Sequence, residues 1–208
     1  MIGFLRMFFY NSGLTKVLSK RRLLFIEKIT GIDIISNKGL LFKNILEVGC
    51  GDGKDLIQFI TNDKIKITGI DLEDRDIKQN NFNLIVGDAE KIEFPDNNFD
   101  LTFSFGVLEH INPILKLNKI ISEINRVSQN YIIIVPSVST LVEPHTGSLL
   151  WPIRSGKRKK GYNLNYFNDE TWLKFDGFNN ANICRFFHFP FIITNLVIYK
   201  IGNYEFID

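Results

Sequence analysis

The feature that most constrains the fold is the segment NILEVGCGDGKDLIQFI, residues 44–60, in which an apolar run ends in closely spaced glycines. The run up to Val48 predicts a β-strand, and the apolar spacing after the glycines predicts a helix that buries Leu56, Ile57 and Ile60. Glycine has no Cβ atom, so the backbone can take positive φ values and approach a ligand closely at Gly49, Gly51 and Gly53. A strand, a glycine turn and a helix in this order predict a ligand site at the carboxyl edge of a parallel sheet.

The same alternation of strand and helix continues along the chain. Apolar runs predict further strands at residues 65–71, 83–88, 99–105 and 131–137. Asn112 and Pro113 are interpreted as the N-cap and first residue of a helix that ends near Val127. Strands that alternate with helices predict an α/β domain with a parallel sheet.

The two ends of the chain and one internal segment depart from this alternation. Residues 14–29 have the apolar spacing of an amphipathic leading helix, and Asn168 caps a predicted short helix from Asp169 to about Phe175. Two β-rich runs that end near Ile201 predict a closing antiparallel hairpin. Residues 136–167 lack periodicity and contain a basic run, as a substrate-side loop insertion would. We expect one domain over residues 1–208, with residues 1–40 as an N-terminal helical extension.

Composition excludes several classes of protein without naming a partner. The 208 residues carry a formal charge of +2, 45% are hydrophobic and 23% are charged, which is typical of a globular protein. The two cysteines, Cys50 and Cys184, form no CxxC pair, so neither a disulfide framework nor a metal site is predicted. No apolar run is long enough to span a membrane and the N-terminus lacks signal-peptide features, so we expect a cytoplasmic protein. Peripheral contact of its Phe-rich start with a membrane stays open.

The glycine segment does not match the dinucleotide-binding fingerprint GxGxxG, because Lys54 stands where the third glycine or a small residue is needed. The segment EVGCGDG, acidic residues at the ends of the next two strands and the segment VLEHI resemble the class I S-adenosylmethionine-dependent methyltransferases. The resemblance covers residues 44–135 and is strongest to the small-molecule, type 11-like group. It implies a Rossmann-like fold with a mainly parallel seven-stranded sheet, a C-terminal antiparallel hairpin and flanking helices. It also implies S-adenosylmethionine as the cofactor.

The resemblance assigns the methionine end of the cofactor to the glycine turn. The loop against this part would consist of Gly49, Cys50, Gly51 and Gly53. Glu47 would support the loop or meet the amino group through water, and Phe105 would line the methionine side with its backbone.

The resemblance assigns the nucleoside to the next two strand ends. Asp71, with Leu72 beside it, would accept hydrogen bonds from both ribose hydroxyls, a task that suits a carboxylate because it offers only acceptors. Asp88 would accept a hydrogen bond from the exocyclic amine of adenine, and the Ala89 amide would donate to the ring.

A general base is optional for this chemistry, and two histidines are candidates for it. His110 follows the predicted fourth strand, and His145 lies in the loop after the fifth. The third, His188, alternates with aromatic residues and is interpreted as structural. The expected acceptor is a small molecule or a glycan-linked or lipid-linked one, and the loop of residues 136–167 is expected to close over it.

Two other functions stay open at the level of sequence. Methylation of RNA is supported only by the basic run at Arg154 and Lys157–Lys160, and SFGV replaces the NPPY-type segment of many nucleic-acid methyltransferases, so nucleic acid is not the expected partner. The other alternative is a cofactor-binding module of the same fold without catalytic activity.

Overall fold

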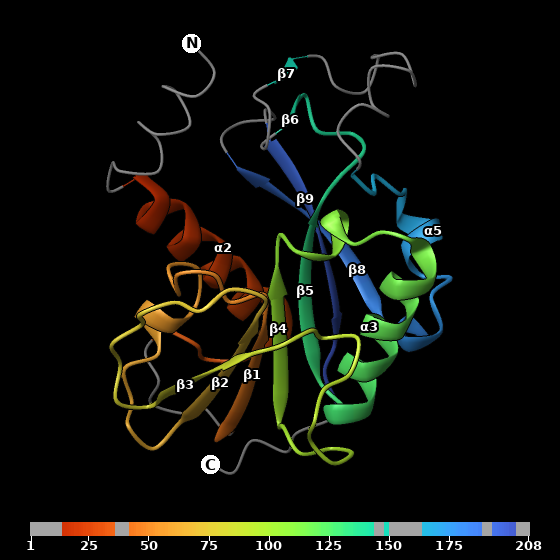
Figure 1. Cartoon of the computed structure of the whole chain (residues 1–208). Helices are drawn as coiled ribbons and strands as arrows, with labels where there is room; N and C mark the ends of the chain where they lie inside the picture. Colours follow the sequence, from red (N-terminus) through yellow and green to blue (C-terminus); the bar gives the residue numbers. More distant parts are fainter. Residues whose placement is uncertain (1–13, 36–41, 144–147, 150–163, 189–192, 203–208) are drawn as a thin grey trace.

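The computed structural model describes residues 14–35, 42–143, 148–149, 164–188 and 193–202. Within these residues seven strands form one sheet in the order β3-β2-β1-β4-β5-β9-β8 (Figure 1). The parallel strands are β1 (Asn44–Val48), β2 (Lys66–Asp71), β3 (Phe82–Val86), β4 (Leu101–Phe105) and β5 (Tyr131–Pro136). The hairpin of β8 (Asn182–His188) and β9 (Ile193–Lys200) completes the sheet, with β9 antiparallel to both of its neighbours. This arrangement confirms the predicted Rossmann-like fold.

The register brings the carboxyl ends of the first strands to one edge of the sheet. Val48 of β1 pairs with Ile70 of β2, and Asp71 at the end of β2 pairs with Val86 of β3. The strand order reverses between β1 and β4, which are themselves paired in parallel. In open α/β sheets such a reversal opens a crevice at the carboxyl ends of the strands, where ligands bind.

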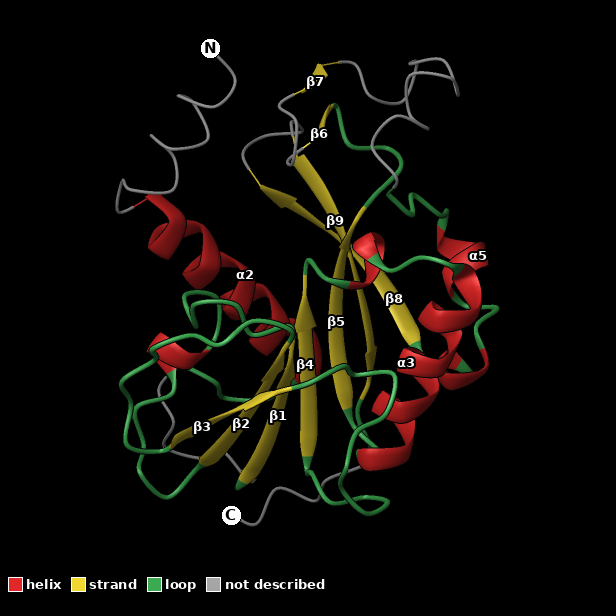
Figure 2. Ribbon diagram, in the orientation of Figure 1, coloured by secondary structure: helices red, strands yellow, loops and turns green. Residues whose placement is uncertain are grey.

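Helices cover the sheet on both faces (Figure 2). On one face α2 (Leu14–Thr30) contributes Leu23 and Ile26 to a buried cluster with Ile45, Leu101 and Phe103 of the sheet. The other face carries α3 (Ile114–Val127), α5 (Asp169–Trp172) and the 3-10 helix η4 (Asp176–Phe178). Residues of α3 on this face are buried with strand residues of β1, β5 and β9. The predicted leading helix is confirmed, and the predicted short helix begins at Asp169 as expected but ends at Trp172 rather than near Phe175.

The predicted helix after the glycine turn is wrong. Only one 3-10 turn, η1 (Ile57–Phe59), forms between β1 and β2, although Leu56, Ile57 and Ile60 are buried as expected. Asp55, just before this turn, accepts hydrogen bonds from two side chains of α2, at 2.7 Å from Ser19 Oγ and 3.2 Å from Arg22 Nη1. Contacts with α2 therefore hold this segment without a regular helix, and its apolar side chains reach the core from an irregular backbone.

Other connections also differ from the prediction. Within the fully described stretch from Gly49 to Asp100, no α-helix connects β1, β2, β3 and β4. Pro113, rather than Asn112, is the N-cap residue of α3, and it makes no side-chain capping hydrogen bond. Asn168 does cap α5, because its Oδ1 accepts from the Thr171 amide at 2.9 Å.

The segment expected to be a loop insertion contains a small two-stranded sheet of β6 (Val142–Glu143) and β7 (Ser148–Leu149). A further 3-10 helix, η2 (Leu108–His110), follows β4. Among the described residues, no helix has both the length and the apolar character needed to cross a membrane.

Candidate active site

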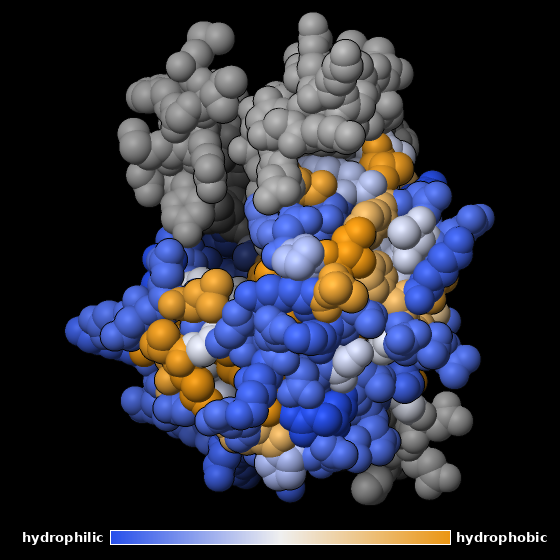
Figure 3. Space-filling model, turned by 45° about the vertical axis from the view of Figure 1, so that its right-hand side comes forward, coloured by the Kyte–Doolittle hydropathy of each residue, from blue (hydrophilic) through white to orange (hydrophobic). Residues whose placement is uncertain are grey.

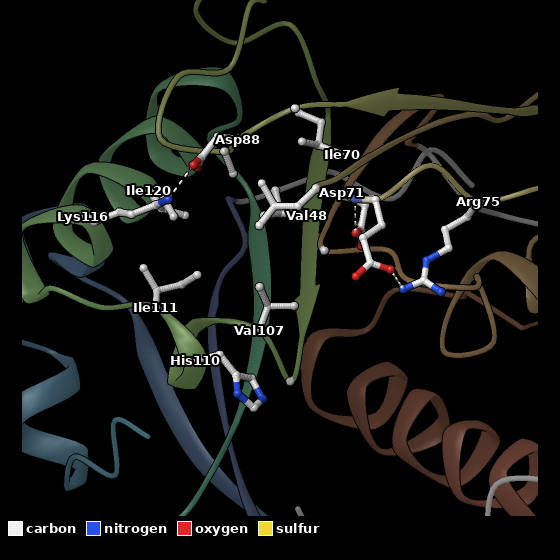
Figure 4. A pocket seen from close by; sticks show the side chains of 16 residues that line it. Val48, Ile70, Asp71, Arg75, Asp88, Val107, His110, Ile111, Lys116 and Ile120 are labelled. Atoms are coloured by element: carbon white, nitrogen blue, oxygen red, sulfur yellow. Dashed lines mark hydrogen bonds and ion pairs between the residues drawn. The ribbon is translucent and has the colours of Figure 1, made fainter. Parts of the chain in front are cut away.

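A cavity of about 300 Å³ opens at the carboxyl ends of β1, β2, β3 and β4 (Figure 4). Asp71 lies on one side of it, Asp88 with Lys116 on another, and His110 on a third. Apolar side chains form much of the remaining wall, namely Val48, Ile70, Ala89, Val107, Ile111 and Ile120. Apolar walls with a few polar groups are typical of small-molecule sites.

The glycine turn is shaped by both backbone conformation and close packing. Gly49, Gly51 and Gly53 have φ values of 71°, 52° and 73°, which side chains rarely allow. A Cβ atom on Gly49 would lie 2.3 Å from Val107 Cγ2, just after β4, so any side chain at this position would clash with Val107. At Gly51 no atom lies within 4 Å of such a Cβ, so the space beside this residue is open.

The Asp71 carboxylate is held in place by backbone amides. Its Oδ2 accepts a hydrogen bond from Gly51 N at 2.8 Å, and its Oδ1 accepts one from Glu73 N at 3.1 Å. Each carboxylate oxygen can accept more than one hydrogen bond. Asp71 therefore fixes the glycine turn and keeps acceptor capacity toward the cavity.

Glu47 lies buried beneath the turn, with only 2% of its surface exposed. Its Oε2 atom has no hydrogen-bond partner among the described residues. Burial raises the pKa of this carboxyl well above its ordinary value, and the nearby carboxylates Asp55, Asp52 and Asp71 raise it further. This surplus of acidic groups favours a cationic ligand next to the glycine turn.

Cys50 is unsuited to act as a nucleophile. Its thiol is buried, and burial, followed by the charges of Glu47 and Asp71, raises its pKa to about 12. The thiolate is the reactive form of cysteine, so this thiol is inert near neutral pH.

Asp88 is held differently from Asp71. Its Oδ1 accepts a hydrogen bond from Glu90 N at 3.0 Å, and its Oδ2 forms an ion pair with Lys116 Nζ from the first turn of α3 (Figure 4). The hydrogen bond from Lys116 is the main cause that lowers the pKa of Asp88 below its ordinary value.

His110 ends η2 at the rim of the cavity, and 45% of its side chain is exposed. Its Nε2 lies 3.9 Å from Oε1 of the buried Glu109. The chain that returns from the long insertion contacts this segment, because Asn165 N donates to Glu109 O at 2.7 Å and Asn165 Nδ2 donates to Ile111 O at 2.6 Å. The described chain that follows residues 150–163 is thus tied to the segment that carries His110.

The structure brings six of the predicted site residues to the cavity wall: Gly49, Asp71, Leu72, Asp88, Ala89 and His110. Five others lie in or beside the turn and strands but outside the wall: Glu47, Cys50, Gly51, Gly53 and Phe105. The Phe105 ring is buried on the opposite face, with the Arg22 guanidinium carbon 5.7 Å from its centroid, and Gly106 and Val107 line the cavity instead.

Of the two remaining histidines, only His188 belongs to the described part of the chain, and it does not line the cavity. His145 lies outside the described residues. His188 is buried next to Phe186, and burial lowers its pKa to about 4, in accord with a structural role.

Sequence reasoning missed that Lys116 and Ile120 of α3 line the cavity. Ile120 has helical spacing from Lys116, which was a usable signal that both lie on one side of α3. No signal in the sequence indicates that Lys116 reaches a carboxylate 28 positions away.

Residues 46–132 match the family described as methyltransferase domain. This region belongs to the class I S-adenosylmethionine-dependent methyltransferases. The cofactor of the domain is therefore S-adenosylmethionine. Its glycine turn, Asp71 and Asp88 all lie within the matched residues.

Known proteins similar to this methyltransferase domain are distant in sequence. An uncharacterized protein of Haemophilus influenzae is 25% identical over 170 residues, which cover 72% of this chain and 64% of that protein. The chain thus spans slightly less than two thirds of that relative.

Solved structures share the fold of this chain. A Pyrococcus horikoshii protein matches with a TM-score of 0.56 at 16% identity, covering 93% of this chain and 97% of its own. The Burkholderia thailandensis 1,6-didemethyltoxoflavin-N1-methyltransferase matches with a TM-score of 0.59 at 12% identity, covering 95% and 82%. That structure contains bound 1,6-didemethyltoxoflavin and S-adenosylhomocysteine.

Proposed function

We propose that this chain is an enzyme that methylates a small-molecule, glycan-linked or lipid-linked acceptor. The observation that carries the proposal is the cavity with Gly49, Asp71 and Asp88 at the ends of three neighbouring strands. When bound, S-adenosylmethionine supplies a methyl group already activated on a sulfonium. The task of the protein is then to align the acceptor and exclude water.

The residues present fit this cofactor. Asp71 has free acceptor capacity for ribose hydroxyls, and the apolar wall suits a purine ring. The buried Glu47 Oε2, together with the open space beside Gly51, suits the ammonium end of a methionine group. We assign Cys50 and Gly53 to the same loop, Leu72 and Ala89 to the nucleoside side, and the backbone of Phe105 to support of the methionine side.

In this proposal His110 accepts the proton of an acceptor hydroxyl. Its position at the rim exposes the imidazole to an incoming molecule while it still lines the cavity. The neighbouring Glu109 carboxylate favours the imidazolium that forms. His145 remains a second candidate, outside the described residues.

Apolar surface near the cavity supports an acceptor with an apolar part. Leu72 is 67% exposed at the cavity wall, and Ile114 and Leu115, next to Lys116, are 55% and 76% exposed. Figure 3 shows that apolar side chains gather in strips on an otherwise hydrophilic face. The small-molecule substrate of the Burkholderia enzyme also fits this class of acceptor.

The proposal extends to the compartment and the domain organisation. Two free thiols support a reducing compartment such as the cytoplasm, with peripheral membrane contact as an addition. We propose one domain over residues 1–208 with a substrate-side insertion. An RNA acceptor would need the basic run, which lies outside the described residues, and a non-catalytic module would bind the cofactor without turnover.

Calorimetry with S-adenosylhomocysteine tests the cofactor site. We expect one-to-one binding, and Asp71→Ala should weaken it by about 1.5–3 kcal/mol, the scale of a hydrogen bond to a charged group. Asp63→Ala is the matched control, because Asp63 is an exposed carboxylate in the loop before β2, at the opposite edge of the sheet. No binding by the wild type, or equal affinity in both variants, would contradict the proposal.

Turnover distinguishes an enzyme from a binding module. With an acceptor found by screening for methyl transfer, His110→Ala should lower kcat by a factor of about 10²–10⁴ if His110 is the general base. The affinity for S-adenosylhomocysteine should change little. An unchanged rate in this variant would remove His110 from the mechanism.

A further inference from the structure

The ion pair between Lys116 and Asp88 joins two parts of the cavity wall that come from different parts of the chain. Asp88 follows β3, whereas Lys116 lies in the first turn of α3, after β4 (Figure 4). Both residues line the cavity, and the exposed fraction is 42% for the Asp88 side chain and 27% for the Lys116 side chain. The pair is thus accessible to a ligand that enters the site.

Both oxygens of Asp88 are already engaged in this structure. Oδ1 accepts from the Glu90 amide, two residues along the chain, and Oδ2 accepts from the Lys116 ammonium. The resemblance to class I methyltransferases, carried into the proposed function, also assigns to Asp88 a hydrogen bond from the exocyclic amine of adenine. Each oxygen can accept a further hydrogen bond, as at Asp71, but here one of the donors is a cation that itself lines the cavity, so a purine amine that approaches Asp88 meets a charged competitor at the same carboxylate.

We propose that Lys116 competes with the exocyclic amine of the cofactor's adenine for Asp88, and that Lys116 thereby sets the selectivity between amino and oxo purines. This inference rests on the proposed function, because it needs adenine at Asp88. An amino group donates hydrogen bonds, so it should bind the Asp88 carboxylate more tightly when the Lys116 ammonium is absent. A 6-oxo group is an acceptor, so the carboxylate repels it while the Lys116 ammonium can donate to it.

The next turn of the same helix provides a matched control. Lys119 Nζ pairs with Glu90 Oε1 at 2.7 Å, so it is also a lysine of α3 that reaches the chain after β3. Neither Lys119 nor Glu90 belongs to the cavity wall. Removal of Lys119 thus changes the same charge without touching the ligand.

The experiment measures the affinities of the full chain for S-adenosylhomocysteine and for S-inosylhomocysteine, which carries an oxo group at purine position 6. Lys116→Met should bind S-adenosylhomocysteine about two- to fivefold more tightly, the scale of one exposed ion pair. It should bind S-inosylhomocysteine more weakly than the wild type does. Lys119→Met should leave both affinities unchanged, and Lys116→Arg should keep the wild-type selectivity, because it keeps a cation beside Asp88.

The salt dependence of the wild-type affinity for S-adenosylhomocysteine is a second test. Salt screens an exposed ion pair, so the wild-type affinity for S-adenosylhomocysteine should rise from about 0.05 to about 0.5 M salt. The same titration should be flatter in Lys116→Met than in Lys119→Met. A wild-type affinity that falls or stays constant over this range contradicts the competition.

The remaining outcomes separate this inference from the function beneath it. Weaker binding of S-adenosylhomocysteine by Lys116→Met would show that Lys116 positions Asp88 instead of competing, and would overturn the inference. Equal selectivity in Lys116→Met and Lys119→Met would overturn it as well. In both cases a wild type that binds S-adenosylhomocysteine through Asp71 leaves the proposed function intact, whereas a wild type that does not bind refutes both.

Discussion

The ends of β2 and β3 carry the same functional group in two different settings. At the end of β2, both oxygens of Asp71 accept from backbone amides, those of Gly51 and Glu73. At the end of β3, Asp88 accepts from one backbone amide and shares its other oxygen with the flexible side chain of Lys116. The first carboxylate is fixed by the fold before any ligand binds, and the second can exchange its partner.

The glycine turn explains why the first setting is rigid. Gly49 N donates to Ile70 O at 2.7 Å, and Gly87 N donates to Asp71 O at 2.9 Å, so the ends of β1, β2 and β3 are connected to one another through backbone groups. Preorganised groups lose little freedom when a ligand binds. We therefore expect changes around Asp71 to act on folding as well as binding, and changes around Asp88 to act mainly on binding.

The largest effect expected is that of Gly49→Ala. A positive φ costs an L-residue roughly 1–2 kcal/mol, and the contact with Val107 adds an overpacking cost of about 1–3 kcal/mol. The free energy of unfolding, measured with urea, should fall by about 2–5 kcal/mol, the sum of these two costs. Gly51→Ala is the control, because it has a positive φ but open space, and it should lose only about 1–2 kcal/mol. Equal losses in the two variants would show that Val107 moves aside freely.

Replacement of each carboxylate by its amide tests the comparison directly. In Asp71→Asn one oxygen remains for two backbone donors, so the free energy of unfolding should fall by about 1–2 kcal/mol. Asp88→Asn keeps an oxygen for the Glu90 amide and loses only the exposed ion pair, so the fall should stay below about 1 kcal/mol. If urea denaturation ranked the two variants in the opposite order, the fold would hold Asp88 more rigidly than Asp71, which contradicts the comparison.

The smallest effect expected is a difference in acid stability. The pKa of Asp88 is lowered in the folded state, so the stability that its ion pair contributes is present above the unfolded pKa and is lost as the pH falls through the lower, folded value. Wild type and Lys116→Met should differ in unfolding free energy by less than about 1 kcal/mol near pH 7, and this difference should vanish at acidic pH below the ordinary aspartate range.

Two neighbouring groups must be considered in that titration. Glu90, paired with Lys119, lies close to Lys116, and Glu123 has a pKa lowered by its hydrogen bond to Arg126. Glu123 keeps its partner Arg126 in wild type and variant, so it cancels in the difference. Glu90 attracts the Lys116 ammonium, so this attraction is part of the charge effect that Lys116→Met removes. A difference that persists unchanged into the acid range would mean that Lys116 acts through packing rather than charge.

Much of the fold could be predicted because the central strands are buried on both faces. Runs such as that of β5, where every residue is buried, have no polar alternation and are recognisable from composition alone. The strand ends with Gly49, Asp71 and Asp88 could be located for the same reason, since each of these residues lies within two positions of the end of a strand. What these residues do toward a ligand stays a prediction.

The wrong helix after β1 shows where such reasoning fails. Leu56, Ile57 and Ile60 have helical spacing and are buried. Burial requires that these side chains reach the core, but it does not determine the backbone conformation from which they do so. The path here depends on Ser19 and Arg22, more than 30 positions away, which hold Asp55. The pairing of Lys116 with Asp88 was missed for the same reason, because a contact between distant segments leaves no local periodicity.

The double contact of Asn165 has a consequence for how this protein could be engineered. Its backbone and side chain both donate to carbonyls of the segment that carries His110, and at the other end of the insertion Thr140 Oγ1 accepts from Thr194 N at 3.1 Å. Both ends of the stretch from Thr140 to Asn165 are thus anchored independently of what lies between them. We expect that segments grafted between these two anchors would leave the cofactor cavity as it is and, under the proposed substrate-side role of this stretch, would change acceptor choice.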